Sequence, residues 1–375
     1  MNHPLVRLML VAVVSSALLT SDRTLAQDAS RAELRFVSTT KAATMEKELN
    51  KLAARGYRLE RVFKGTLDGH LAAFVATNVK GSTTTRYEYK MLTTRRAATI
   101  EKEIMEAAAQ GYEIRGLIST LRSGFDIMIG GETVALLERP FGESARRYDY
   151  KVLSSKLEKT IQEELDQAVS AGFTPTEVVL TEDAGGPSGL VGPQFVVTTI
   201  LVRTANASDS SSVAGREYKF LEISKDGTME REMNRAAKEG YRLYFCSYVL
   251  VALMYRDRGA TGPAPYQYKL LATNKTETMQ KELSEQSRLG YRYLATTSGL
   301  GVFTTVLERD LKPEGKESRH EYKLISASRQ QKTQTDITEA LAAGYQLLDL
   351  TTFGKFVAVL GRKSEEAPAK VNTTP

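Results

Sequence analysis

The sequence predicts an α+β protein of six tandem strand–helix–strand–strand repeats, each a two-layer module with one helix on a small sheet. Three observations predict this fold: a recurring phrase centred on Tyr-x-Tyr-Lys, a glycine–aromatic pair whose glycine follows the second tyrosine by 22 residues in five repeats and by fewer in the first, and an apolar segment ending in arginine. One repeat of about 50 residues is marginal alone. We therefore expect the repeats to pair their sheets or faces.

The recurring phrase predicts the first strand of each repeat. In YEYKML, at 87–92, the side chains of Tyr87, Tyr89 and Met91 alternate with the others, so they lie on one strand face. Phe36 takes the place of the second tyrosine in the N-terminal repeat. The related phrases are YDYKVL at 148–153, REYKFL at 216–221, YQYKLL at 266–271 and HEYKLI at 320–325.

The segment before each glycine predicts a helix. Ile100, Ile104 and Ala107 precede Gly111 by 11, 7 and 4 positions, a spacing that places them on one helical face. The glycine suits a left-handed C′ position, and the aromatic residue after it can pack back on the last turn. The pairs are Gly56–Tyr57, Gly111–Tyr112, Gly172–Phe173, Gly240–Tyr241, Gly290–Tyr291 and Gly344–Tyr345.

A threonine just before the start of five predicted helices suggests an N-cap, because its hydroxyl can accept a first-turn N–H. Lys332 replaces it in the last repeat, which predicts a different start for that helix. The five threonines are Thr44, Thr99, Thr160, Thr228 and Thr278.

Two strands follow each glycine, and we expect them to form a hairpin. The crossover through the helix should be right-handed and should join parallel strands. The predicted organisation is a signal peptide at 1–26, repeats at 33–78, 86–140, 147–203, 216–257, 265–310 and 319–363, a linker at 204–215 and a disordered tail at 364–375.

The Tyr-x-Tyr-Lys phrase, the short amphipathic helix, the Gly-aromatic pair and the final Arg together resemble the small bacterial domain of unknown function 4177. The resemblance covers nearly all of residues 33–363. That family typically has Trp after the glycine, whereas this chain has Tyr or Phe there and no Trp anywhere. The resemblance implies a small α+β module and supplies no activity or site residues.

The N-terminus predicts export to the periplasm or the extracellular space. Arg7 precedes an apolar run at 8–19, and Thr24 and Ala26 suit a cleavage site before Gln27. The alternative is an uncleaved membrane anchor, for which the run is short. We expect no transmembrane anchor after signal cleavage. The only cysteine, Cys246, excludes an internal disulfide and is expected to be a buried, inert thiol.

Charged residues recur in register and suggest either an anion-binding ladder or ion pairs within each module. Long side chains at strand ends commonly reach to water, which favours the structural alternative. With 51 Lys and Arg interspersed among 45 Asp and Glu, the net charge of +6 indicates a mixed surface and no nucleic-acid partner. The candidate anion-binding residues are Lys90, Lys151, Lys219, Lys269, Lys323, Arg139, Arg203, Arg256, Arg309 and Arg362.

No catalytic constellation is apparent. His70 and His320 lack metal-ligand spacing with other residues, and no nucleophile-elbow phrase occurs, so we expect no enzyme activity, metal or cofactor. The hairpin segments 121–133 and 181–194 are long, and such loops often carry recognition. The candidate partner-binding residues are Phe125, Ile127, Met128 and Ile129, and packing on a neighbouring repeat is the alternative for them.

The sequence thus favours an exported, non-enzymatic repeat protein that binds a protein or cell-envelope partner. A polyanion-binding protein that uses the recurring Lys and Arg positions is the alternative, and strong salt dependence would distinguish it. A hydrolase is the third hypothesis. The sequence leaves the partner, the arrangement of the six sheets and the oligomeric state open.

Overall fold

The computed structural model describes residues 33–62, 71–77, 85–94, 97–120, 132–145, 147–155, 158–183, 194–205, 215–222, 228–247, 251–299, 302–312, 319–352 and 355–364. In these ranges the chain forms six helices and eighteen strands, arranged as six three-stranded antiparallel sheets. The predicted α+β class is confirmed. We number the successive groups of strand, helix, strand and strand as units 1 to 6.

The elements follow one order in every unit. The first strands are β1 (Leu34–Thr39), β4 (Tyr87–Thr94), β7 (Tyr148–Ser155), β10 (Arg216–Glu222), β13 (Tyr266–Thr273) and β16 (His320–Ala327). The helices are α1 (Ala42–Ala53), α2 (Ala97–Ala108), α4 (Glu158–Ser170), α5 (Met229–Lys238), α6 (Thr276–Arg288) and α7 (Gln330–Ala342).

The remaining strands form a hairpin in each unit, as predicted. The second strands are β2 (Tyr57–Val62), β5 (Glu113–Thr120), β8 (Thr174–Asp183), β11 (Arg242–Ser247), β14 (Arg292–Gly299) and β17 (Gln346–Thr352). The third strands are β3 (Leu71–Thr77), β6 (Glu132–Pro140), β9 (Gln194–Thr204), β12 (Val251–Asp257), β15 (Val302–Asp310) and β18 (Phe356–Lys363).

The third strand lies in the middle of each sheet and pairs antiparallel with both others. The first two strands are therefore parallel but not adjacent. In β6, Val134 and Leu136 pack in the core that contains α1, while Ala135 and Leu137 pack in the core that contains α2. A strand buried on both faces needs a continuous apolar run, which explains the VALL segment in β6.

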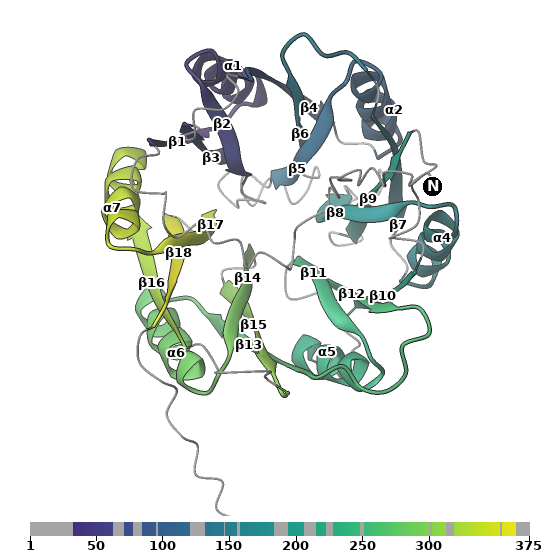
Figure 1. The fold of residues 1–375 in the computed structure, drawn as a ribbon, viewed down its shortest axis with the longest axis vertical. Coiled ribbons are helices and arrows are strands. Elements are labelled where there is room, and N and C mark those ends of the chain that lie inside the picture. Colours follow the sequence, from purple (N-terminus) through teal and green to yellow (C-terminus); the bar gives the residue numbers. More distant parts are fainter. Residues whose placement is uncertain are drawn as a thin grey trace, which may run out of the picture.

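The six units form a closed ring, with the helices around the outside and the second strands nearest the centre (Figure 1). Each helix packs on its own sheet and on the first strand of the next unit. The last helix, α7, packs in the same way on β1 of unit 1, so the ring closes.

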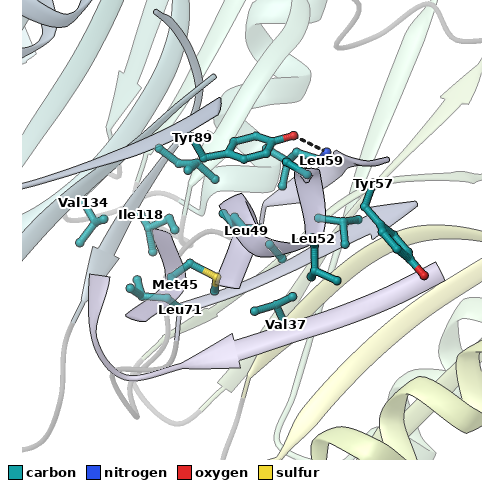
Figure 2. Packing of buried hydrophobic residues seen from close by; sticks show 14 residues of the cluster. Val37, Met45, Leu49, Leu52, Tyr57, Leu59, Leu71, Tyr89, Ile118 and Val134 are labelled. Atoms are coloured by element: carbon teal, nitrogen blue, oxygen red, sulfur yellow. Dashed lines mark hydrogen bonds between the residues drawn. The ribbon is translucent and has the colours of Figure 1, made fainter. Parts of the chain in front are cut away.

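Each hydrophobic core belongs to two units. Around α1, Met45 and Leu49 contact residues of their own sheet together with Tyr89, Ile118 and Val134 of unit 2 (Figure 2). The core around α7 likewise includes Phe36 and Ala72 of unit 1. Because a helix buries apolar surface against two sheets, a unit without its neighbours would expose part of its core.

The helix ends show where local prediction succeeded and failed. All six glycines have φ between 83° and 94°, and Tyr112 N–H donates to the Ala107 carbonyl at 3.1 Å, so the predicted left-handed termination is confirmed. Of the threonines, Thr228 is an N-cap and accepts from Arg231 N–H at 3.4 Å. The prediction was wrong for Thr44, Thr99, Thr160 and Thr278, which lie at the third position inside their helices.

The helix of unit 6 also corrects a prediction. It begins two residues before Lys332, as α1 begins two residues before Thr44, so the lysine does not change the start. The predicted signal peptide at 1–26 lies outside the described residues, as do 365–375 of the predicted tail. No helix in the described ranges is long and apolar enough to cross a membrane.

Candidate functional site

An arginine lies near the end of the third strand in units 2 to 6, and in four of these units it makes the same three contacts. Arg256 donates from Nε to Glu217 Oε2 at 2.8 Å and from a terminal nitrogen to the carbonyl of Glu239 at 3.1 Å. Its guanidinium also lies 4.6 Å from the centre of the Tyr241 ring. The equivalent arginines Arg139, Arg203 and Arg362 do the same with Glu88, Asp149 and Glu321 and with Tyr112, Phe173 and Tyr345.

Unit 5 departs from this arrangement because Gln267 stands where the others have an acid. Arg309 donates to Gln267 Oε1 at 2.6 Å and to the Leu289 carbonyl at 3.4 Å, but its buried Nε has no hydrogen-bond partner. In every one of these units the arginine stabilises the carbonyl end of the helix, where a positive charge complements the helix dipole.

The recurring lysines of the first strands make less regular contacts than these arginines. Lys219 lies 5.4 Å from the Tyr241 ring centre and pairs with Glu239. Lys90 and Lys323 lie 5.8 and 5.9 Å from the Tyr112 and Tyr345 rings. Lys269 pairs instead with Glu230 at 3.4 Å, and Lys151 is half-buried in β7. The ten candidate residues are thus spread over five units and do not meet in one site.

Side-chain amides join five of the helices, α1, α4, α5, α6 and α7, to the next sheet. Asn50 in α1 accepts from Tyr89 N–H and donates to the Tyr89 carbonyl, both at 2.9 Å. Asn234 in α5 makes the same pair of bonds with Tyr268. These bonds satisfy backbone groups at the open edge of β4 and β13, an edge that would otherwise be available to another strand.

The strand tyrosines connect units in a second way. The hydroxyl of Tyr89 accepts from Leu59 N–H at 2.8 Å, and that of Tyr268 accepts from Leu243 N–H at 2.8 Å (Figure 2 shows the first). Tyr150 and Tyr322 accept in the same way from Ile114 and Tyr293. For Tyr218 the equivalent position in the second strand of the preceding unit is Pro175, which has no backbone N–H to donate.

Two buried carboxylates, Glu308 and Glu138, lie between units and each accepts from several donors. Glu308 has no exposed surface and accepts from Tyr268 Oη at 3.1 Å and from Arg242 at 3.0 Å, with Arg292 as a third donor. Glu138 accepts from Tyr89 Oη and Arg58, both at 2.9 Å. Several donors satisfy each charge, so these clusters fix the contact between units rather than leave a reactive group.

The second strand of every unit contains a β-bulge, which bends the strand and redirects its side chains near the centre of the ring. Contacts between neighbouring units follow from these bends. Tyr244 donates to the Pro175 carbonyl at 2.5 Å, and Asp349 accepts from Tyr293 Oη at 2.8 Å. The bulge residues, which have no pairing partner in the third strand, are Glu60, Arg115, Thr176, Tyr244, Leu294 and Leu348.

A surface pocket of about 580 Å³ lies between α6 of unit 5 and the ends of β16 and β18 in unit 6. We call it the junction pocket. Its lining is Ser284, Arg288, Arg319, His320, Glu321, Tyr322, Arg362, Lys363 and Ser364.

Only Arg362 of these residues belongs to the predicted anion-binding set. Arg288, Arg319 and Lys363 are basic residues from a helix end, a strand start and a strand end, and they meet only through the packing of unit 5 on unit 6. A comparison of equivalent positions in the six predicted repeats would have revealed that the described basic residues gather here.

The predicted partner-binding residues Phe125, Ile127, Met128 and Ile129 lie outside the described residues, as does His70. His320 lines the junction pocket, where its ring stacks on Tyr322 with the centroids 6.1 Å apart. Within the described ranges, no three His, Cys, Asp or Glu side chains gather closely enough to hold a metal ion. Cys246 is buried, and burial raises the pKa of its thiol to about 12.

No family model matches the sequence, and no curated protein matches it either.

Proposed function

We propose that this protein is an exported, non-enzymatic scaffold whose six units are copies of one repeat and whose ring presents loops to a protein or cell-envelope partner. The observation that carries the proposal is the closure of the ring through α7 and β1. A framework whose two ends hold each other keeps all six hairpins in fixed relative positions. Loops on such a rigid framework are frequent carriers of recognition.

The use of the charged residues supports a scaffold over a polyanion-binding protein. Arg139, Arg203, Arg256 and Arg362 each stabilise a helix end and pair with an acid of their own unit. A polymer would have to compete with these contacts at each of these four units.

The equivalence of the Asn50–Tyr89 and Asn234–Tyr268 contacts supports descent of the units from one repeat. The kinship with the domain of unknown function 4177 is part of this proposal.

Partner capture with a matched variant tests the scaffold. The bait is the mature protein from Gln27 onward, incubated with an extract of the source cell's envelope and washed at low and then high salt. The variant replaces Ile127 and Met128 with serine, and the control replaces Leu190 and Val191, in the other long hairpin segment, with serine. We expect one discrete protein to survive high salt on the bait and on the control, and to be lost with the variant.

Two other outcomes would contradict the proposal. Release of all bound material at high salt would support the polyanion alternative, because screening weakens contacts to charged polymers. Turnover of an envelope component that disappears with a single substitution would support an enzyme.

A further inference from the structure

We propose that the ring opens transiently at the contact between α7 of unit 6 and β1 of unit 1, while the other five contacts stay closed and every unit stays folded. We call this contact junction 6–1 and number the other junctions in the same way. The inference goes beyond the scaffold function, because it concerns movement of the framework itself rather than what its loops bind.

The course of the chain is the first argument. At each of the other five junctions, the third strand of one unit is followed in sequence by the first strand of the next. Among the described strands β1 is the first and β18 the last, so the two units of junction 6–1 are held only by non-covalent contacts. Two units without a short connection gain more conformational freedom when they separate, which favours opening at this junction.

A buried hydrogen bond between neighbouring units is the second argument. At junctions 1–2, 2–3, 4–5 and 5–6, a first-strand tyrosine accepts from a backbone N–H in the second strand of the preceding unit, as Tyr89 does from Leu59. At junction 3–4, where Pro175 has no N–H, Tyr244 donates to the Pro175 carbonyl instead. Five junctions thus have a buried tyrosine hydroxyl that bonds the neighbouring backbone.

Junction 6–1 has a leucine in place of this tyrosine. In unit 1 the N–H that bonds a side chain ten residues before the helix glycine of the preceding unit belongs to Phe36, and in unit 2 the equivalent N–H belongs to Met91. Tyr89 lies two residues before Met91, so its counterpart is Leu34, and the prediction that Phe36 replaces the tyrosine was wrong. A leucine has no hydroxyl that could accept the hydrogen bond.

Apolar packing and an exposed hydrogen bond take the place of the tyrosine contact. Leu34 and Leu347 pack in the core around α7. Between the second strands β2 and β17, the exposed side chain of Arg61 donates to the Leu348 carbonyl. An exposed hydrogen bond stabilises a contact less than a buried one, because water can replace the partner.

The buried face of the helix is the third argument. The residue eleven positions before the helix glycine is Met or Ile in five helices, where it packs in a core shared with the next unit. In α7 that residue is Thr333, which is buried and donates its hydroxyl to the Arg329 carbonyl of the same helix. Threonine is smaller and polar, so α7 gains less from burial against unit 1. The five apolar residues are Met45, Ile100, Ile161, Met229 and Met279.

The sheet of unit 6 allows opening to be distinguished from unfolding. Ala358 in β18 packs in the core around α7, whereas Val357 of the same strand packs in the core around α6. Separation of α7 from β1 would expose part of the first core and leave the second buried. Junction 6–1 is therefore a place where the ring can open without loss of strand pairing in either unit.

The test measures the rate at which a thiol reagent labels single cysteines in the full mature chain. Cysteine replaces the buried alanine four residues before the helix glycine in four units, and these positions report on junctions 2–3, 3–4, 4–5 and 6–1. Cys246 stays in place, and mass spectrometry of peptides assigns each label. We expect labelling at Ala340→Cys to be at least tenfold faster than at the other three. The four positions are Ala107, Ala168, Ala236 and Ala340.

Val357→Cys is the control for unfolding of unit 6. Because it lies in the core around α6, we expect it to be labelled as slowly as Ala236→Cys. Equally fast labelling of Val357→Cys and Ala340→Cys would overturn the proposal, because the whole unit would then unfold. Equal rates at the four alanine positions would overturn it as well.

A reciprocal pair of substitutions tests the cause. Thr333→Met should slow the labelling of Ala340→Cys at least threefold, because it restores the apolar contact. Met229→Thr, at the equivalent position of α5, should accelerate the labelling of Ala236→Cys at least threefold and decides the question if Thr333→Met lowers the Tm. Unchanged labelling of Ala236→Cys in a folded Met229→Thr protein would overturn the proposal, because this residue would not control the closure of a junction.

Discussion

Gln330 in α7 donates a hydrogen bond to the carbonyl oxygen of Phe36 in β1 at 2.6 Å, although 294 positions separate the two residues. Gln334 accepts from Phe36 N–H at 3.2 Å, and the Phe36 ring meets Phe356 edge-on with centroids 5.0 Å apart. These contacts join the last unit to the first. They also cover the edge of β1, which an open row of units would leave available to other strands.

The first prediction concerns this closure. Replacing Gln330 and Gln334 together with alanine should lower the free energy of unfolding by about 1–3 kcal/mol, because two backbone groups of Phe36 lose their partners. Amide hydrogen exchange should accelerate in β1 more than in β10, and urea denaturation should report the loss. Gln331→Ala, at an exposed position of the same helix, is the control. Unchanged protection of β1 in the double variant would show that closure does not depend on these amides.

The second prediction compares two glycines with the same backbone conformation. A Cβ at Gly240 would lie 2.8 Å from the Gly262 carbonyl oxygen, whereas a Cβ at Gly56 would meet nothing within 4 Å. Both have positive φ, so alanine should cost about 1 kcal/mol at Gly56 from backbone strain alone. Gly240→Ala should lower the Tm further, because the overlap adds to that strain. Equal Tm values for the two variants would contradict the close approach of Gly240 to the Gly262 carbonyl.

The third prediction is a reciprocal exchange between units 4 and 5. Gln267→Glu should stabilise the protein by about 0.5–1 kcal/mol, because the buried Nε of Arg309 gains the acid partner that Arg256 has in Glu217. Glu217→Gln should destabilise it by a similar amount. Both changes in the free energy of unfolding should become smaller in 1 M NaCl, as measured by urea denaturation. A stabilisation by Gln267→Glu that is independent of salt would argue against an ion pair.

The fourth prediction concerns alkaline pH. Burial and the charge of Glu308 raise the pKa of Tyr268 far above its usual value, and burial raises the pKa of Tyr322 to about 12. The folded protein keeps these protons at a pH where the unfolded chain releases them. Stability is therefore complete below about pH 10 and falls as the pH rises through the interval between the unfolded and folded pKa values.

Tyr268→Phe separates this effect from other alkaline changes. A buried tyrosine whose pKa stays well above 11 should account for about 1.4 kcal/mol of the stability lost between pH 8 and pH 11. The loss over that interval should therefore be smaller by about this amount in Tyr268→Phe, whatever its stability at pH 8. Urea denaturation at both pH values measures the difference. Identical losses in the two proteins would indicate that Tyr268 titrates normally.

Local features were predictable because their causes lie within a few residues. Gly111 ends α2 since a left-handed residue is needed there, and Ile100 and Ile104 mark the buried face of the same helix. Four of the N-cap predictions were wrong because a threonine at the third position of a helix has sequence neighbours similar to those of a threonine just before the helix. Only the geometry of Thr228 placed its hydroxyl on the first turn.

The sequence by itself determined the order of strand, helix and hairpin in each unit, since phrase and glycine lie 22 residues apart in five units and 20 in the first. Tertiary structure alone decided that the third strand lies in the middle of each sheet, that α7 meets β1 and that Arg288, Arg319 and Lys363 share a pocket. The physical reason is that each core is shared by two units, as Leu49 and Tyr89 share one. Contacts of this kind depend on which apolar faces can be buried together, and that is settled only when all six units pack.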